Sequence, residues 1–336
     1  MGSITAKHVA RLIGVSQSTV SRAFTEDASI AAVTRDRVMK AALELGYEPN
    51  VIARSLITRR TNIVGIVMAN LTNPFYPEVL EQLTKALQHN GLQTLLFNVP
   101  PGKDVDDELP LVLQHQVDAV IITSSTVSSS MATACAERGT PVILLNRYVP
   151  SACVHAISCD NYAGGRAVAD YLLETGHRRP AFVAGRPDTT TNLDRERGFV
   201  ERLTETNVPV LTKEGGDDYT YEAGRTAALR LVSASIAPDA IFFANDIMAI
   251  GGLDAIREES DLRVPADVSV VGFDDIRMSE WPSYSLTTVR QPVAEMVDKA
   301  VALIAMPSLQ SLQTPKTVFI PGRLIVRNST LDRMRS

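Results

Sequence analysis

Two groups of polar side chains in this sequence have the types and the spacing that molecular recognition requires. The first group is Gln17, Ser18, Ser21 and Arg22. In a helix these positions share one face, and their amide, hydroxyl and guanidinium groups can form hydrogen bonds with the base edges and phosphates of nucleic acids. A helical hairpin whose polar face is merely solvated explains the same pattern equally well.

The second group lies in the rest of the chain, where short polar segments directly follow apolar runs. These segments are 73–76, 146–147, 245–246 and 274–275. Asp274 can accept hydrogen bonds from two hydroxyls, whereas Asn146 and Asn245 can either donate or accept. Aromatic residues such as Phe75 offer flat faces to the C–H side of a sugar ring. This chemistry suits a polyhydroxylated ligand.

The first group needs a helix to present it, and the flanking sequence predicts a small helical domain. Apolar residues from Ala6 to Ile13 follow the spacing of a helix with one buried face, and Thr5 stands at the N-cap position. Gly14 supplies the left-handed residue that ends this helix. Ser16 can then cap a second helix of about nine residues, which carries the polar group.

A third helix completes this domain. It is predicted to begin at Thr34 and to end at Gly46, with Val38 and Leu45 at positions of its buried face. Three short helices make a minimal domain with the polar group on its surface.

The second group needs strands, and apolar runs alternate with amphipathic segments from residue 61 onward. The runs are 63–69, 94–98, 118–123, 141–146, 180–185, 240–245 and 268–273. Such runs between helices indicate parallel sheets that are covered on both faces, and we expect two sheets of about six strands each. Breaks near 158–161 and 285–292 indicate two Rossmann-like lobes with crossing connections. A ligand would then bind between the lobes, at the carboxyl ends of the strands.

Charge is distributed unevenly along the chain. The whole sequence has 33 Lys and Arg against 38 Asp and Glu, which gives a net charge of −5. The first 60 residues hold nine basic and five acidic residues, whereas the remainder holds 24 basic and 33 acidic residues. A basic module on an acidic body fits nucleic-acid contact at one end of the chain.

Other features disfavour several classes of protein. The cysteines, Cys135, Cys153 and Cys159, are odd in number and form no CxxC pair, which argues against a disulfide framework or a zinc site. We expect no cofactor. No run approaches the roughly 18 apolar residues of a membrane span, and residues 1–5 lack the features of a signal peptide. We therefore expect a cytoplasmic protein with no membrane partner.

One long motif carries a specific resemblance. The segment 9–23, VARLIGVSQSTVSRA, resembles the VAxxAGVSxxTVSR signature of the lactose/galactose repressor (LacI/GalR) family of bacterial transcriptional regulators, with Ile13 where the family usually has Ala. Segments 34–38 and 45–50 resemble the third helix of the family and its exit. The resemblance continues in segments 245–251, 264–275, 286–292 and 323–329, and so covers nearly the whole chain.

The resemblance implies an N-terminal all-α helix-turn-helix domain and an α/β core, similar to periplasmic binding proteins, of two Rossmann-like lobes. The expected boundaries are 1–48 for the DNA-binding domain, 49–60 for a hinge helix or linker, and 61–336 for the core. Within the core, the first lobe would comprise about 61–160 and 291–320, and the second lobe about 161–290 and 321–330.

The resemblance also assigns contacts with DNA to two segments. Carried over position by position, they are Thr5, Ser16, Gln17, Ser18, Thr19, Ser21, Arg22, Asn50, Ala53 and Leu56. Leu56 matches a leucine that the family pushes between base pairs when two hinge helices pack in the minor groove. Residues 50–57 are too few to stay helical alone in water. A flexible linker whose Leu56 covers the adjoining domain is the alternative.

Contacts with an effector are carried over in the same way. They are Phe75, Tyr76, Asn146, Arg195, Tyr219, Asn245 and Asp274. For Asn245 the alternative is a helix cap, and for Arg195 it is a salt link that bridges the lobes. Arg195 and the neighbouring Arg147 could also recognise a carboxylate or phosphate. A sugar, a sugar acid and a sugar phosphate therefore remain open as effectors.

The resemblance implies a homodimeric, sequence-specific repressor whose affinity for double-stranded operator DNA is controlled allosterically by a sugar or sugar derivative. An enzyme is the first rival, but the sequence shows no GxGxxG after a strand, no GxxxxGK[ST] and no GxSxG. A periplasmic binding protein is the second rival, and it would need an export signal and no helix-turn-helix. Residues 331–336 lack the leucine heptads of tetrameric family members, which favours a dimer.

Overall fold

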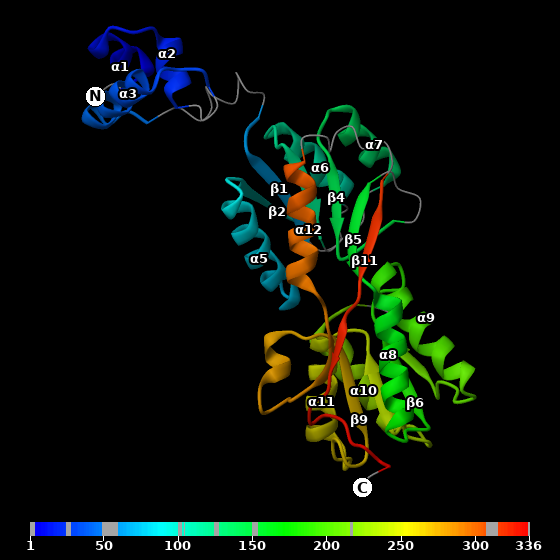
Figure 1. The fold of residues 1–336 in the computed structure, drawn as a ribbon. Coiled ribbons are helices and arrows are strands. Elements are labelled where there is room, and N and C mark those ends of the chain that lie inside the picture. The colour runs from blue at the N-terminus through cyan, green and yellow to red at the C-terminus, as the bar shows by residue number, and fades with distance from the viewer. Residues whose placement is uncertain are drawn as a thin grey trace. The chain divides into compact units, whose positions relative to one another are not determined.

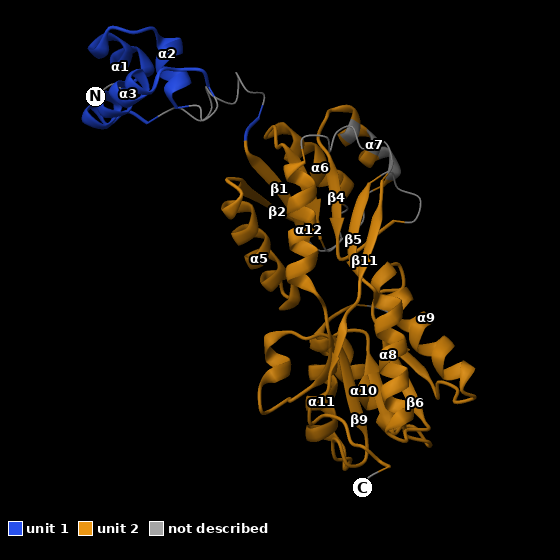
Figure 2. Ribbon diagram, viewed as in Figure 1, with its two compact units in different colours: residues 1–61 blue, residues 62–336 orange. Residues whose placement is uncertain are grey.

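The computed structural model describes residues 4–24, 28–48, 60–99, 103, 105–123, 128–149, 154–215, 218–306 and 315–334. Contacts divide the chain into two compact units, residues 1–61 and residues 62–336 (Figure 2). The fold class predicted from the sequence is confirmed, since the first unit is helical and the second contains two largely parallel sheets.

The first unit is a bundle of α1 (Ala6–Ile13), α2 (Gln17–Ala23) and α3 (Ala32–Leu45). One fully buried valine from each helix, Val9, Val20 and Val38, lies in its core. Gly14 ends α1 in the left-handed conformation, with φ of 67°, and so allows the tight turn into α2.

Two predicted boundaries in this unit are wrong. α2 spans seven residues rather than nine, because the chain leaves the helix at Phe24. α3 begins at Ala32 rather than at Thr34, because the carbonyl of Ala31 already accepts from the N–H groups of Thr34 and Arg35 at 2.9 and 3.0 Å. Ala31 has no side chain that could mark this N-cap in the sequence.

The second unit begins with a six-stranded parallel sheet in the order β11-β5-β4-β3-β1-β2. Its strands are β1 (Ile63–Ala69), β2 (Gln93–Val99), β3 (Ala119–Ile122), β4 (Val142–Leu145), β5 (His155–Cys159) and β11 (Thr317–Ile320). The helices around it are α5 (Phe75–His89), α6 (Val105–Gln114), α7 (Ser129–Glu137) and α12 (Val293–Ala305). α5 packs against α12 and α6 packs against α7 (Figure 1). Separate core clusters involve the two helix pairs, as a doubly covered sheet requires.

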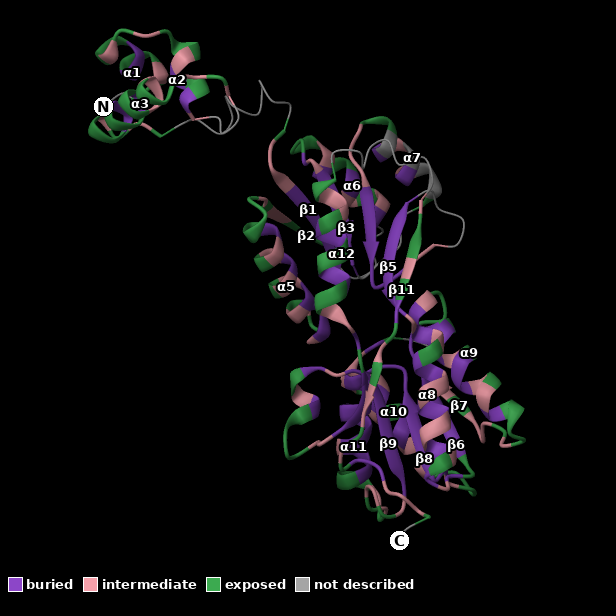
Figure 3. Ribbon diagram, in the orientation of Figure 1, coloured by how far each residue is buried: buried purple, intermediate pink, exposed green. Residues whose placement is uncertain are grey.

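The other sheet has six strands in the order β12-β10-β9-β8-β6-β7, and only the β10–β12 pair is antiparallel. Its strands are β6 (Pro180–Ala184), β7 (Lys213–Gly215), β8 (Ala240–Phe243), β9 (Ser269–Asp274), β10 (Thr287–Arg290) and β12 (Arg323–Ile325). The helices of this lobe are α8 (Asn161–Glu174), α9 (Thr190–Glu205), α10 (Tyr221–Val232), α11 (Asp246–Glu259) and the 3-10 helix η1 (Arg277–Glu280). The buried strands form the centre of each lobe (Figure 3).

The chain crosses between the lobes at Asp160, at Gln291 and Pro292, and at Pro321 and Gly322. The first lobe is therefore completed by α12 and β11, and the second lobe by β12.

Glycines fix the position of α9, which carries one of the predicted effector contacts. A Cβ on Gly165 of α8 would overlap the carbonyl of Arg195, and a Cβ on Gly198 of α9 would overlap the carbonyl of Tyr162. The two helices can therefore touch backbone to backbone only because both positions lack a side chain.

Candidate functional sites

The exposed face of α2 carries the polar group predicted for DNA contact. Gln17, Ser18, Ser21 and Arg22 are exposed, whereas Val20 and Ala23 on the opposite face are buried. The Arg22 Nε donates to the Ser18 carbonyl at 3.3 Å, which orients the guanidinium along the helix. This face combines donors and acceptors with small neighbours, which suits entry into a DNA groove.

The remaining predicted DNA contacts fall into two sets. Ser16 caps α2, because its Oγ accepts from the N–H of Thr19 at 3.1 Å. Thr5 is the exposed N-cap residue of α1, and its N–H donates to the His8 Nδ1 at 3.1 Å. The predicted hinge contacts lie outside the described residues; they are Asn50, Ala53 and Leu56.

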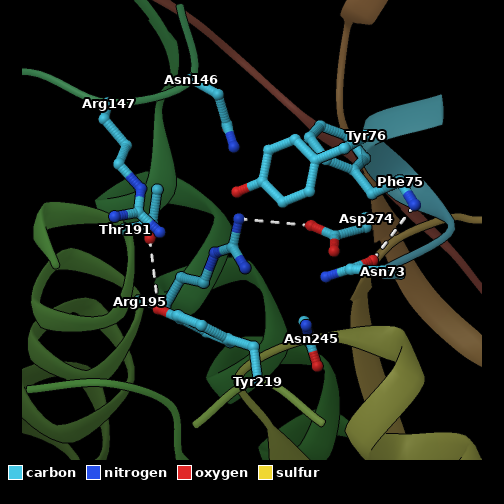
Figure 4. Close-up of a pocket in the computed structure, with 10 residues that line it drawn as sticks. All are labelled: Asn73, Phe75, Tyr76, Asn146, Arg147, Thr191, Arg195, Tyr219, Asn245 and Asp274. Carbon is cyan, nitrogen blue, oxygen red and sulfur yellow. Dashed lines mark hydrogen bonds and ion pairs between the residues drawn. The ribbon is translucent and has the colours of Figure 1, made fainter. Parts of the chain in front are cut away.

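A cavity between the two lobes brings together every residue predicted to contact an effector (Figure 4). Its volume is about 250 Å³, including its opening to solvent. The first lobe contributes Asn73, Phe75, Tyr76, Asn146 and Arg147, and the second lobe contributes Thr191, Arg195, Tyr219, Asn245 and Asp274. Most of them follow the carboxyl ends of β1, β4, β8 and β9, where open α/β sheets bind ligands.

Arg195 is the most firmly held side chain of this cavity. Its Nε donates to Asn161 Oδ1 at 2.8 Å, one terminal nitrogen donates to the Ala244 carbonyl at 2.6 Å, and the other lies 3.3 Å from Asp274 Oδ1. Its Cζ lies 3.7 Å from the centre of the Phe273 ring. This ion pair joins α9 to β9 inside the second lobe. The pair with Asp274 is therefore not the salt link between the lobes that was considered as an alternative role for Arg195.

Asp274 is a buried carboxylate with two donors on one oxygen. Besides Arg195, Gln291 Nε2 donates to its Oδ1 at 2.7 Å. Burial raises the pKa of Asp274 above the ordinary carboxyl value, the charge of Arg195 limits that rise, and the nearby Asp246 carboxylate adds to it. Its backbone has φ of 123°, a conformation that costs energy for any side chain. Strain and burial together are typical of a functional position.

Tyr219 forms one aromatic wall of the cavity. Its hydroxyl lies 2.6 Å from Thr189 Oγ1 and 3.2 Å from Thr191 Oγ1. A Cβ on Gly185, which directly follows β6, would overlap its ring. The glycine therefore makes room for the ring against the end of the strand.

The first lobe places unsatisfied polar atoms in the cavity. Asn146 Oδ1 and Arg147 Nε are buried and have no hydrogen-bond partner among the residues that the structure describes, and Asn146 adopts a left-handed backbone conformation with φ of 70°. Burial raises the pKa of Tyr76, and the adjacent Arg147 guanidinium opposes the rise. Buried polar atoms of this kind are costly unless something binds them.

Asn245 caps a helix and also lines the cavity. Its Oδ1 accepts from the N–H of Met248 at 3.1 Å and so caps α11, while the residue also lines the cavity. The cap uses Oδ1, which leaves the amide Nδ2 as the group to offer a ligand.

The sequence did not place Asn73 and Thr191 among the predicted effector contacts, and it gave Arg147 only as an alternative partner for a carboxylate or phosphate. Asn73 and Arg147 belong to polar segments that follow strands, so this signal could have found them. Thr191 lies in the first turn of α9, where no local pattern distinguishes it from a residue that only starts a helix.

Hydrogen bonds made by side chains join the lobes beside the cavity. The Tyr148 hydroxyl of the first lobe donates to Asp194 Oδ2 of α9 at 2.8 Å. The N–H of Arg277 in η1 donates to Glu78 Oε1 of α5 at 3.2 Å. In this structure the lobes are therefore connected directly at both places.

Two features are absent from the described part of the chain. No helix there is long and apolar enough to cross a membrane. Nor does it contain a group of three or more His, Cys, Asp or Glu side chains placed to hold a metal ion.

Comparison with known proteins gives matches along the chain. Residues 5–50 match the family of bacterial regulatory proteins, lacI family, and residues 169–330 match the periplasmic binding protein-like domain. The HTH-type transcriptional regulator CelR of Thermobifida fusca is 32% identical over 336 residues, which cover 97% of this chain and 98% of that protein.

Solved structures show the same architecture. A lac repressor dimer bound to operator and the anti-inducer ONPF has a TM-score of 0.87 at 25% identity, covering 98% of this chain and 100% of that chain. A complex of the transcriptional regulator CelR with cellobiose has a TM-score of 0.71 at 31% identity, covering 97% of this chain and 99% of that chain. The similarity thus includes both units.

Proposed function

Because this chain belongs to the lacI family of bacterial regulatory proteins, we propose that its cavity binds a small polar metabolite and thereby controls the affinity of α2 for operator DNA. Like the relatives it matches, the chain is a DNA-binding transcriptional regulator and not an enzyme. The observation that carries the proposal for the cavity is the pair of buried, unpartnered atoms Asn146 Oδ1 and Arg147 Nε. A bound ligand would satisfy both of them.

The effector is proposed to be a sugar or sugar derivative. The Asp274 carboxylate can accept a hydrogen bond and Asn245 Nδ2 can donate one, so together they can bind neighbouring hydroxyls of a sugar. Tyr219 and Phe75 supply aromatic faces for a ring.

For DNA, the proposal is that two copies of the chain place two α2 helices in successive major grooves of a near-palindromic operator. Residues 1–48 would read the DNA and residues 49–60 would form the hinge, with Leu56 inserted into the minor groove. The protein would act as a cytoplasmic repressor. Effector binding between the lobes would change how the hinges pair, with a coupling of roughly 1–3 kcal/mol.

The DNA part is tested with Arg22→Gln. We expect affinity for the operator to fall more than affinity for random DNA, because a base contact contributes only to the specific complex. Equal losses on both DNAs, measured at one fixed salt concentration, would remove Arg22 from base recognition.

The effector part is tested with Asp274→Ala. A metabolite that raises the unfolding temperature of the unchanged protein is identified first, since a ligand that binds only the folded state stabilises it. The variant should keep its affinity for operator DNA and lose the response to that metabolite. A normal response in the variant would exclude Asp274 from the effector site.

A further inference from the structure

We infer that the effector carries an anionic group, a carboxylate or a phosphate, and that Arg147 binds it; this inference rests on the proposed effector site. The cavity is lined by two guanidinium groups and one carboxylate. Arg195 is paired with Asp274 at 3.3 Å. Arg147, by contrast, forms no ion pair with any carboxylate of the described residues.

Arg147 is a buried cation without a counter-charge. Its exposed fraction is 9%, and its Nε has no hydrogen-bond partner in the described part of the chain. The adjacent Tyr76 hydroxyl is a neutral partner. Asp188 experiences the charge of Arg147 only weakly, and its carboxylate is engaged by Arg186 at 2.7 Å. Burial of an unpaired charge is costly, so the site is organised to receive an anion.

The position of Arg147 also defines how the ligand would lie. The next residue, Tyr148, places its N–H 3.5 Å from Thr190 Oγ1 at the start of α9, so the chain around Arg147 approaches the second lobe at this end of the cavity. Arg147 and Asp274 come from different lobes and are both seen in Figure 4. An acid with hydroxyl groups could therefore bind Asp274 with the hydroxyls and Arg147 with its anionic group. Guanidinium pairs with carboxylate and phosphate through two parallel hydrogen bonds.

The experiment uses the full chain and a small-molecule extract of the source organism, passed over a strong anion-exchange resin. The unfolding temperature and the operator affinity are measured with the whole extract, the unretained fraction and the retained fraction. We expect the effector activity in the retained fraction. Activity in the unretained fraction would overturn the inference, although the proposed function would stand. An effect of the whole extract tests the proposed function separately.

The retained fraction is then treated with alkaline phosphatase. Loss of activity identifies a phosphomonoester, and persistence of activity indicates a carboxylate or a phosphodiester. Either result supports the inference, because each of these groups is an anion that Arg147 is proposed to bind.

Two variants connect the result to Arg147. Arg147→Met should weaken the response to the retained fraction by about 10- to 100-fold, the loss expected for hydrogen bonds to a charged group. Arg186→Met is the matched control, because it removes an exposed charge that is already paired with Asp188, and it should leave the response unchanged. If both variants weakened the response to the retained fraction equally, Arg147 would act only through its long-range charge, and the inference would be wrong.

A measurement without ligand tests the same point. Arg147→Met should raise the unfolding temperature of the ligand-free protein by about 2 °C or more, because it removes a buried, uncompensated charge. A lower unfolding temperature would show that Arg147 is a structural residue of the ligand-free protein, contrary to the inference.

Discussion

At the residue scale, the carboxylates behind the cavity couple stability to pH. Burial raises the pKa of Asp246 and of Asp274 above the ordinary carboxyl value near 4. Each carboxyl then binds its proton more tightly in the folded than in the unfolded protein. Their contribution to the free energy of unfolding is fully present below the unfolded pKa, and it is lost as the pH rises through the folded pKa.

We expect Asp274→Asn to flatten this fall between about pH 4 and pH 7, by up to about 4 kcal/mol, at roughly 1.4 kcal/mol for each pH unit of this window. The substitution removes one titrating group, whose pKa is raised by burial and by the nearby Asp246 carboxylate. Urea unfolding, monitored by circular dichroism at several pH values, measures the slope of the free energy of unfolding against pH. An unchanged slope in the variant would show that Asp274 does not titrate in this range.

Gly185 gives a second prediction at this scale. A Cβ at this position overlaps the Tyr219 ring, so Gly185→Ala should displace the ring and weaken effector binding by about tenfold, which corresponds to roughly 1.4 kcal/mol. Effector affinity is measured by titration calorimetry on folded protein.

The matched control is Gly252→Ala in α11. Its Cβ overlaps the Phe243 ring in the core of the same lobe, so it should destabilise the protein by about 1–3 kcal/mol through overpacking. The affinity of its folded fraction for the effector should not change. A similar loss of affinity in both variants would indicate general distortion of the lobe.

At the element scale, the end of α3 depends on one backbone conformation. Gly46 has φ of 63°, and its added Cβ would meet open space. Gly46→Ala should therefore destabilise the first unit by about 1–2 kcal/mol through backbone strain alone. Gly46→Asn should cost less, because asparagine tolerates this conformation. Amide hydrogen exchange of α3 in the full chain measures the effect, and equal exchange in the two variants would contradict the assigned cause.

Local signals explain which elements the sequence could predict. The glycines that end α1 and α3, and the apolar spacing of both helices, act within a few residues and were predicted correctly. The runs that became β1, β3, β4, β6, β8 and β9 are continuous and apolar, and they identified these strands. The motif at residues 9–23 then identified the arrangement of α1 and α2.

Elements stabilised by distant partners were not predicted. β5 contains polar residues, and their partners are remote in sequence. His155 Nδ1 accepts from the N–H of Lys316 at 3.3 Å, and Ser158 Oγ donates to the Asn146 carbonyl at 3.3 Å. β7 has only three residues at the sheet edge. In the cavity, the ion pair of Arg195 with Asp274 joins residues far apart in the chain, so spacing could not reveal that it lies within one lobe.

At the scale of the whole molecule, we expect the contacts between the lobes to stabilise the arrangement in which they are joined, the closed form. Tyr148→Phe removes the hydroxyl that binds Asp194 but keeps the ring, which packs edge-on against Phe319 at 5.2 Å. The closed form should become less populated. The apparent effector affinity should therefore fall several-fold, while saturating effector still produces the full response at the operator.

Tyr171→Phe is the control for this prediction. Its hydroxyl lies 2.7 Å from Thr330 Oγ1 within the second lobe, so the same chemical change should leave effector affinity unaltered. Calorimetric titration compares the two variants. Equal affinities for the effector would mean that the Tyr148 contact does not control closure.

The crossing connections also determine when the first lobe can fold during synthesis. β11 pairs with β5 and α12 packs on α5, yet α12 and β11 are translated after every other described element of the first lobe. Until they leave the ribosome, the nascent lobe exposes the unpaired edge of β5 and an uncovered helix face. Such edges invite aggregation. Messages truncated before this segment should therefore yield chains that depend on chaperones, even though most strands of both lobes have already been made.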